Sequence, residues 1–582
     1  MISLSGFDGA NKAVHPRLLL ATVGQDSINQ DPTHADLRPW RQAQALVDRS
    51  FGVDTPATVI SNAVRIYRYG RQELENKFFS VINPGSWKGF SQEVSIAVPP
   101  NAAWFDEAIV AYSEGAKYVG THVSSLGPDP QDSWDANADG ILCGRPLSIP
   151  GPAAAPTLTL MRNGDLSGST VTEETRFYVY TYVNDLGWES EPSPISAQVD
   201  ALPLSRIRVS GFTAAAAPLK ITKFRIYRTQ PGMSGEADFF FVDEIAASET
   251  EYFEDGMGQE PLTELCDTFG LAPFPADGKN IITLWNGMMA CSVGRTVRYC
   301  EPNKPYAWPL QYETMLDDEV ICLAKFGQRL VAVTASGTKL IDGASPDSMQ
   351  DTPGYVAIGT TAARSVVEFN KSAVVYASKS GLVMVDNGTP RIITDGILMQ
   401  HQWQALGPET MVGCFYKGLY IASYIAPGSG NVRKAFAIDP LNPKGIYWMD
   451  AGFSTTYFDD MLGGMFYHVA GQLYQFDAAA TFMTATWESK TFRTPKPVTY
   501  KTCELLAEAY PAVTFSFRAL MDPTPGNPTP SEVTFSKTVT GQREFKLKPG
   551  FMASEWIFKI QTTTPVQIAN VAMSVEELKA SV

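Results

Sequence analysis

Apolar and polar residues alternate along most of this chain in short runs that end at Gly, Pro, Ser or Asn. Residues 326–342, FGQRLVAVTASGTKLID, and residues 369–386, FNKSAVVYASKSGLVMVD, show the pattern most clearly. Each begins with an aromatic residue, alternates through apolar positions, breaks at a Ser/Gly turn and ends on an apolar strand closed by Asp. Alternation with a period of two on both sides of a turn predicts a β-hairpin.

The hairpin recurs through the middle of the chain with a spacing of roughly 40–50 residues. Repeats of this length built from hairpins are typical of β-propeller blades, which bury their faces by stacking on one another. We therefore expect a β-propeller with about five visible blades at residues 269–484. The alternative is a pair of stacked sandwiches with accidental similarity. An acidic residue closes each copy and is interpreted as a turn residue of the repeat: Glu301, Asp342, Asp386, Asp439 and Asp477.

The flanking segments alternate in the same way but do not repeat. In residues 151–268, Tyr178, Tyr180 and Tyr182 fall on one face of a predicted strand. Short strands at intervals of about ten residues are typical of a β-sandwich. We therefore expect a β-sandwich at 151–268 and a second β-sandwich at 485–582. The first resembles fibronectin type III modules in its Y-x-Y-x-Y strand, its GWESEPSP turn and its FRIYRT strand. The fold class is then mainly β and multidomain, with a β-propeller between β-sandwich modules.

Residues 1–150 show little clean periodicity and include an extended, Pro-punctuated arm at residues 15–41. A Pro- and Ala-rich segment, residues 144–160, separates this region from the first sandwich and is expected to be stiff and extended. We expect residues 1–150 to form an N-terminal platform region whose extended arm is laid over a surface and which packs with the C-terminal sandwich. The alternative is a strongly β domain completed from elsewhere.

Composition narrows the function classes. The 582 residues are 44% hydrophobic and 18% charged, which is ordinary for a folded protein, and the net charge is −15. That charge argues against a protein that wraps DNA or lies on a membrane, because both use dense Lys and Arg. No stretch approaches the ~18 apolar residues of a membrane span, and the N-terminus lacks a secretory pattern, so we expect no membrane-spanning segment and assembly in the cytoplasm.

One string resembles a metal-binding loop. DANADG places Asp135, Asn137 and Asp139 at alternate positions, as in the first half of an EF-hand calcium loop. The twelfth position of that loop should be Glu and is Pro146 here, so a surface turn is favoured and these residues remain a weak metal candidate. No catalytic or nucleotide-binding motif is present, and we expect neither an enzyme nor a cofactor.

Two acidic doublets are candidates for glycosidase carboxylates. They are Asp317/Asp318 and Asp459/Asp460. Adjacent residues on a strand point to opposite faces, so neither doublet supplies a catalytic pair by itself. We interpret both as solvated loop charges. The seven cysteines include no C-x-x-C pair and are expected to be free thiols.

The order of these segments resembles the nozzle proteins of short-tailed bacteriophages, the tail tubular protein B class. Four segments carry the resemblance: the N-terminal run from Asn11-Lys12-Ala13 through HPRLL to Trp40, the Pro/Ala linker, the ESEPSP turn, and TWESKTFRTPKP at 486–497. Residues 101–140 match no part of the family pattern.

The resemblance implies a structural virion protein of the tail, assembled in the host cytoplasm. Six copies would form a homo-hexameric ring below the adaptor and portal, with N- and C-terminal regions packed as a platform and with tail fibres or spikes as further partners. The ring would retain the packaged genome, and genomic double-stranded DNA would pass through its lumen without specific binding. An acidic lumen fits that role, because it repels phosphates.

The arm suggests how neighbouring subunits meet. A ring of identical subunits needs two different patches on each chain, and an extended arm can wrap a neighbour. We expect Arg17, Arg38 and Trp40 to be subunit-interface anchors, because Arg and Trp dominate interface hot spots; packing within their own chain is the alternative. The competing functions are a receptor- or glycan-binding phage tail protein, which predicts clustered exposed Trp, and a propeller glycosidase, which predicts converging carboxylates.

Overall fold

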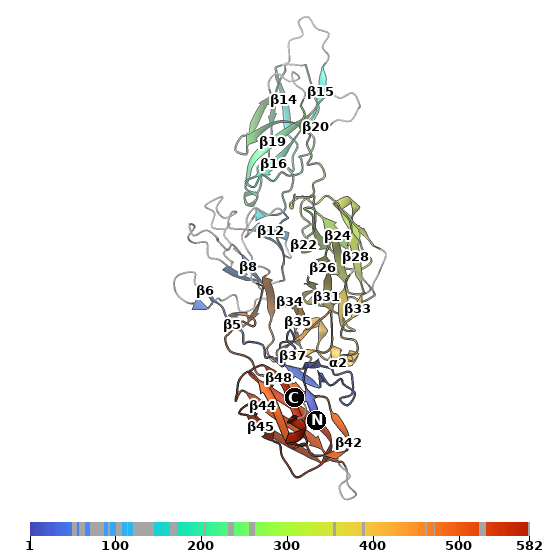
Figure 1. Cartoon of the computed structure of the whole chain (residues 1–582). Helices are drawn as coiled ribbons and strands as arrows, with labels where there is room; N and C mark the ends of the chain where they lie inside the picture. The colour runs from blue at the N-terminus through green and yellow to red at the C-terminus, as the bar shows by residue number, and fades with distance from the viewer. Residues whose placement is uncertain are drawn as a thin grey trace.

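The protein is mainly β: strands account for 48% of the chain and helices for 5% in the computed structural model. The molecule is elongated, and both termini lie in the same end of it (Figure 1). The structure describes residues 1–48, 55–56, 65–69, 86–90, 93–100, 108–112, 115–119, 145–162, 173–202, 205–230, 238–254, 262–352, 357–386, 390–459, 463–470, 472–522 and 531–579.

The end remote from the termini consists of two three-stranded antiparallel sheets, here called the two-sheet module (residues 157–254; Figure 1). Tyr178, Tyr180 and Tyr182 share one core with residues of the facing sheet, as the alternation predicts, whereas Val179 belongs to a separate buried cluster behind them. The sheets are β14 (Thr157–Arg162), β18 (Arg206–Ser210) and β21 (Glu251–Glu254), and β16 (Tyr178–Asn184), β19 (Ile221–Thr229) and β20 (Phe239–Ala246); β15 (Glu174–Arg176) pairs with β17 (Val199–Ala201).

A serine ladder covers the free edge of β16. Ser190, Ser193 and Ser196 stand at every third position, which is the period of a polyproline II helix. Their backbone N–H groups donate to the carbonyls of Tyr182, Tyr180 and Tyr178, respectively. Each hydroxyl oxygen accepts from the N–H of the same tyrosine, at 2.9, 3.2 and 2.9 Å. The edge that would otherwise offer unpaired backbone groups is therefore closed.

The middle of the chain forms successive four-stranded antiparallel sheets. The five predicted hairpins are confirmed as β23–β24, β27–β28, β31–β32, β35–β36 and β39–β40. The bounds are β22 (Lys279–Thr283), β23 (Met289–Val293), β24 (Thr296–Tyr299), β25 (Glu313–Met315), β26 (Val320–Phe326), β27 (Arg329–Thr334), β28 (Thr338–Asp342), β29 (Gln350–Asp351), β30 (Val367–Phe369), β31 (Ala373–Ala377), β32 (Leu382–Val385), β33 (Arg391–Ile392), β34 (Val412–Tyr416), β35 (Leu419–Ile425), β36 (Arg433–Ile438), β37 (Tyr447–Met449), β38 (Thr455–Asp459), β39 (Gly464–Val469) and β40 (Gln472–Gln475).

The first strands of these sheets touch in series: β22 contacts β26, β26 contacts β30, β30 contacts β34, and β34 contacts β38. A further four-stranded sheet packs against β22 and consists of β10 (Ser95–Ala97), β11 (Ala108–Tyr112), β12 (Gly115–Val119) and β13 (Arg145–Pro146). Strand β38 contacts β8 (Arg65–Tyr69), which pairs with β9 (Ser86–Phe90).

The C-terminal module consists of two sheets that share a core around Trp487, Phe515 and Trp556. Its strands are β41 (Ala485–Glu488), β42 (Phe492–Val498), β43 (Thr502–Ala507), β44 (Val513–Leu520), β45 (Glu532–Val539), β46 (Phe545–Lys546), β47 (Ala553–Thr562) and β48 (Val566–Ala572). The α-helices among the described residues are short: α2 (Gln400–Gln404) and α3 (Val575–Lys579). No helix of the described part is long and apolar enough to cross a membrane.

N-terminal strands connect these parts. Strand β1 (Ile2–Leu4) pairs with β48 in the C-terminal module. Strand β4 (Asp26–Ile28) lies between β37 and β41 and so merges a repeat sheet and a C-terminal sheet into one ten-stranded sheet. Strand β5 (Gln44–Ala45) is the fourth strand beside β40. Other short strands of the segment are β2 (Asp8–Ala10), β3 (Val23–Gly24) and β6 (Val47–Asp48), the last paired with β7 (Thr55–Pro56).

Candidate functional site

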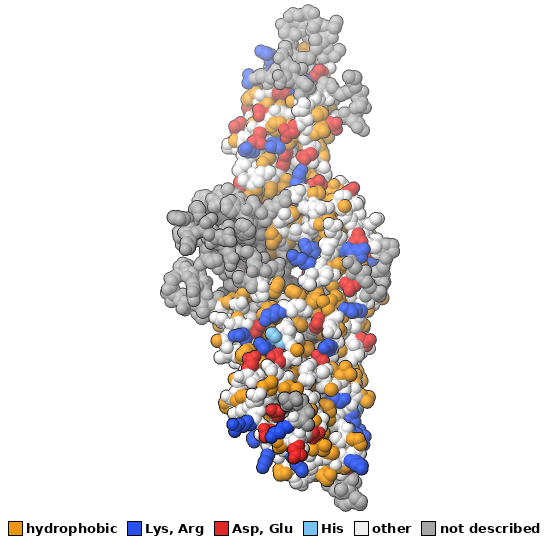
Figure 2. Space-filling view, in the orientation of Figure 1, with side chains coloured by type: hydrophobic (Ala, Val, Ile, Leu, Met, Phe, Trp, Pro, Cys, Tyr) orange, Lys and Arg blue, Asp and Glu red, His pale blue; other side chains and the backbone are white. Residues whose placement is uncertain are grey.

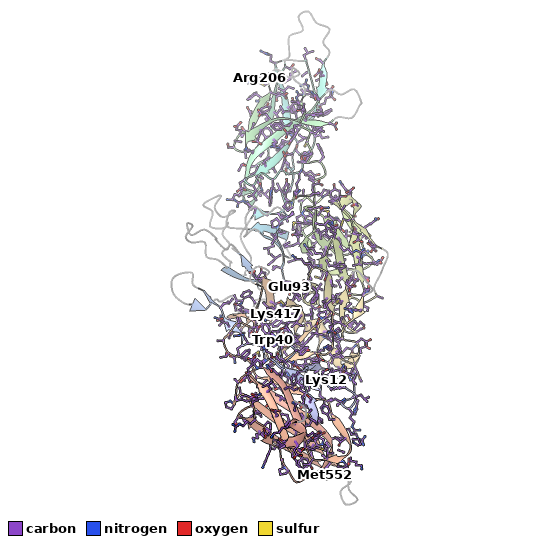
Figure 3. The ribbon with its side chains drawn as sticks, viewed as in Figure 1. Lys12, Trp40, Glu93, Arg206, Lys417 and Met552 are labelled. Atoms are coloured by element: carbon purple, nitrogen blue, oxygen red, sulfur yellow. The ribbon has the colours of Figure 1, made fainter. Side chains whose placement is uncertain are left out.

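Trp40, one of the three expected interface anchors, is fully buried within its own chain. Its ring lies 6.2 Å from the ring of Tyr416 and 5.0 Å from that of Phe476, measured between centroids. The Lys417 ammonium stands 5.7 Å from the same ring, and Figure 3 shows the two side chains together. A side chain with no exposed surface has none to offer a second subunit, so the structure favours the alternative of intramolecular packing for Trp40.

Arg17 and Arg38 keep part of their surface exposed. Arg17 pairs with Glu555 of the C-terminal module while 45% of its side chain stays exposed. Arg38 donates to Asp36 at 3.1 Å and to Glu508 at 3.4 Å. The hydrogen bond that Arg38 donates to Asp36 is the main cause that raises the pKa of Arg38. Both arginines tie the arm to the C-terminal module, and whether a neighbouring subunit also uses them stays a prediction.

The loop that contains Arg17 exposes two leucines. Leu18 is 76% and Leu20 is 71% exposed, although Leu19 between them is buried. Hydrogen bonds hold the backbone of this loop at both ends. The Thr491 N–H donates to the Pro16 carbonyl at 3.1 Å, and the Lys490 ammonium donates to the Leu19 carbonyl at 2.5 Å. The arm thus presents apolar side chains from a fixed loop, although its anchors are intramolecular.

The two-sheet module is joined to the rest of the molecule by a buried ion pair. Arg145 of β13 is 1% exposed and donates from Nε and Nη2 to both carboxylate oxygens of Asp185 at 2.5–3.2 Å. Beside it, the rings of Trp188 and Tyr306 stack with centroids 5.0 Å apart. Planar two-point pairing fixes orientation as well as distance, so this joint holds the module in one direction.

A cavity of about 710 Å³ lies where the first strands of the repeat sheets meet β10. A second hollow of about 410 Å³ shares four lining residues with it. Both are lined from β10 and β22, and the second also from β26, β30 and β38. The larger cavity carries charged side chains of both signs: Glu93, Lys279, Arg364, Glu409 and Arg433.

Two of the arginines in this set contact neighbouring groups. Arg364 lies with Nε 3.7 Å from Glu93 and also donates to the Ser454 carbonyl. Arg433 donates to the Thr410 carbonyl at 3.4 Å. Burial lowers the pKa of Arg433. No sequence motif points to this set, because its members lie far apart in the sequence, from Glu93 before β10 to Arg433 in β36, and meet only through the packing of the sheets.

The acidic residues singled out in the sequence fall into different environments. Asp342 pairs with Arg329 at 3.2 Å, and Asp477 accepts from the Arg41 N–H at 2.8 Å and from the Lys417 ammonium at 2.7 Å. Asp439 accepts from the N–H of Leu441, two residues on, as a turn residue does. These closing acids are therefore held in local structural contacts.

The expectation of solvated loop charges is wrong for one member of the doublets. Asp317 is solvated, with 82% of its side chain exposed, and pairs with Lys339 at 3.3 Å. Asp459 is fully buried, because β38 extends to this residue and pairs it with Gly464 in the sheet. From the sequence alone, a polar residue next to a turn is expected to lie outside the strand. Here β38 includes Asp459 as its last residue.

The metal candidates Asp135, Asn137 and Asp139 lie outside the described residues. Within the described residues, no group of three or more His, Cys, Asp or Glu side chains is arranged to hold a metal ion. Six cysteines are described as free thiols, four of them buried: Cys291, Cys300, Cys414 and Cys503.

No protein-family model and no curated protein sequence matches the chain. Among solved structures, the CNH domain of AfRom2 is similar over 48% of this chain and 89% of that chain, with 9% identity and a TM-score of 0.24. An exo-β-1,3-galactanase from Phanerochaete chrysosporium is similar over 63% and 93%, with 7% identity and a TM-score of 0.15. PorZ, a surface component of the type-IX secretion system of Porphyromonas gingivalis, covers 79% and 78%, with 10% identity and a TM-score of 0.24. Likenesses this weak carry no argument about function.

Proposed function

We infer that the repeat sheets form a β-propeller and that the two flanking modules are β-sandwiches, the first of the fibronectin type III-like kind. Successive contacts between first strands, and a cavity lined by those strands, support radial stacking of the sheets. The last repeat sheet takes its fourth strand, β5, from the N-terminal segment, which is a natural way to fasten such a ring. Two facing sheets with one core support the sandwich assignments.

We propose that this chain is a structural virion protein: the tail nozzle subunit of a short-tailed phage, which retains the packaged genome and forms the channel for its ejection. One observation carries the proposal beyond the order of segments. The N-terminal segment enters both the repeat region and the C-terminal module, through β1, β4 and β5. This interlocking supports the rigid platform of N- and C-terminal regions that the resemblance implies.

The distribution of charge along the molecule also supports the proposal. Residues 151–268 hold 18 Asp and Glu against 8 Lys and Arg, whereas residues 485–582 hold 9 against 11. These segments form opposite ends of the molecule, and Lys and Arg gather over the C-terminal end in Figure 2. With the platform toward the adaptor, the acidic end points away from the capsid, where it repels the phosphates of outgoing DNA.

The competing reading as a glycan-binding tail protein expects exposed tryptophans as stacking platforms. The tryptophans whose side chains are described are buried or half-buried: Trp40, Trp188, Trp285, Trp308, Trp403, Trp448, Trp487 and Trp556. No observation favours that function over the nozzle.

The test combines the full chain with the portal and adaptor proteins of the same phage and examines the particles by electron microscopy. The expected result is a six-fold ring seated on the adaptor, with a mass of about 380 kDa, six times the 63.5 kDa subunit. The adaptor ring without this chain is the control. A chain that stays monomeric beside the adaptor, or that degrades a polysaccharide, would overturn the proposal.

A further inference from the structure

Arg433 is a cation without an acidic partner on the largest cavity described. It begins β36 and lines the cavity of about 710 Å³ together with residues of β10, β11 and β22. Its single hydrogen bond is to the Thr410 carbonyl at 3.4 Å, which is a long contact. Among the described side chains, no carboxylate lies within ion-pair distance of its guanidinium.

Arg433 is half-buried, so its guanidinium carries part of the cost of removing a charge from water. Burial removes water from the charge, and the cost is recovered only when an anion or several hydrogen bonds replace that water. The lowered pKa of Arg433 has burial as its one cause, which agrees with the absence of a facing carboxylate. An arginine held this way is prepared to accept a planar anion through two parallel hydrogen bonds.

The rest of the cavity indicates what kind of anion fits. The lining residues that the structure describes include three cations, Lys279, Arg364 and Arg433, and two carboxylates, Glu93 and Glu409, which together carry one net positive charge. A single carboxylate group neutralises that charge, whereas a doubly charged phosphate leaves an excess beside two glutamates. The two acids likewise disfavour a polyanion such as nucleic acid.

The uncharged lining residues indicate the chemical nature of the rest of the ligand, to which the carboxylate is attached. Apolar side chains and polar groups both line the cavity, and none of its described lining residues is aromatic. The volume lies within the roughly 300–1,000 Å³ range of small-molecule sites. The apolar members are Val94, Ala111, Ala362, Ala363, Met411, Val412 and Ile425, and the uncharged polar members are Ser95, Asn280, Thr361 and Thr410.

We propose that this cavity is a binding site for a small organic monocarboxylate with hydroxyl groups, such as a uronic acid. The carboxylate binds Arg433, Lys279 attracts it across the cavity, and the hydroxyls bind the Thr and Asn side chains. Arg364 is held by Glu93 and Ser454, so its role is to keep Glu93 away from the ligand carboxylate. The site is independent of ring assembly, because a single chain supplies every residue.

Titration calorimetry on the full chain tests the site with glucuronate and, as the matched neutral sugar, glucose. We expect glucuronate to bind saturably in the millimolar range and glucose not to bind. Arg433→Met should weaken glucuronate binding roughly ten- to hundred-fold, the usual effect of a charge-assisted hydrogen bond. Glu409→Gln, at an exposed side chain, should strengthen it several-fold by removing a repelling charge.

The Glu409→Gln variant guards against misfolding as an explanation, since a gain of affinity requires a folded site. Equal binding of glucose and glucuronate would overturn the proposal, as would an unchanged affinity in both variants. Failure of glucuronate, galacturonate and lactate alike to bind the unaltered chain would also overturn it. Tighter binding of inorganic phosphate than of any of these acids would contradict the charge argument.

Discussion

Replacing Ser193 with alanine tests the serine ladder. The Ser193 hydroxyl accepts from the Tyr180 N–H at 3.2 Å and donates to the Pro194 carbonyl at 3.0 Å. Ser193 is 4% exposed and Tyr180 is fully buried, so water cannot replace the hydroxyl. The backbone bond from the Ser193 N–H to the Tyr180 carbonyl, at 2.9 Å, survives the substitution. The change therefore leaves one buried amide N–H without its acceptor.

An unsatisfied buried donor costs about 1–3 kcal/mol. Since about 1.4 kcal/mol corresponds to a factor of ten, local opening at β16 should become roughly 5- to 150-fold more frequent. Hydrogen–deuterium exchange of the full chain measures this directly on peptides that cover residues 177–184. Peptides from β44 in the C-terminal module serve as the internal reference and should not change.

The matched control is Ile195→Ala, two residues further along the same segment. Ile195 is 54% exposed, so its truncation should leave the exchange of β16 close to that of the unaltered chain. The reasoning is refuted if Ser193→Ala exchanges at the unaltered rate, or if the control accelerates exchange equally. In the second case the segment, and not the hydroxyl, protects the edge.

Three further substitutions follow from the described contacts. Trp40→Ala should lower the free energy of unfolding in urea by about 3–5 kcal/mol, because it leaves a cavity in the core. The control Met552→Ala, at a residue 59% exposed, should change that free energy by less than about 0.5 kcal/mol. Equal effects of the two substitutions would contradict the burial of Trp40. Asp185→Ala should cost about 1.5–3 kcal/mol by removing the two-point hydrogen bonds to the Arg145 guanidinium. The loss should be visible as earlier proteolysis at the joint, and unchanged proteolysis would contradict the role of this ion pair. Burial lowers the pKa of His468, so the unfolded chain binds a proton at this imidazole more readily than the folded chain does. The free energy of unfolding should therefore fall as the pH drops below about 6.5, and His468→Gln should flatten this fall. A variant whose urea midpoint depends on pH as steeply as that of the unaltered chain would contradict the prediction.

Local patterns in the sequence predicted what is local in the structure. Alternation located the five hairpins and put Tyr178, Tyr180 and Tyr182 on one face, because strand period and turn residues act within a few positions. Pairings across hundreds of residues leave no such trace, and the insertion of β4 between β37 and β41 is of this kind.

The same limit explains the site residues. The residue type of Trp40 predicts an interface anchor, because Trp is common at interface hot spots. Its burial depends instead on Tyr416 and Phe476, which pack over it and lie far along the chain. Arg433 begins an ordinary strand and shows nothing unusual in its sequence context. Its place on a cavity appears only when segments far apart in the sequence pack together, and no described carboxylate lies within ion-pair distance of its guanidinium.

The position of β4 also sets a timetable for synthesis. Asn29, directly after β4, is synthesised early, but its hydrogen-bonding partner Asp450 lies 421 residues later in the chain. At about 5–20 residues per second, the N-terminal segment waits roughly 20–80 s for the strands that flank it. During that interval the nascent chain must keep this segment from pairing with the wrong edge, including one on a neighbouring nascent chain. Only chains translated past β41 can seat it, so truncated products are left with an open seam that proteases can recognise.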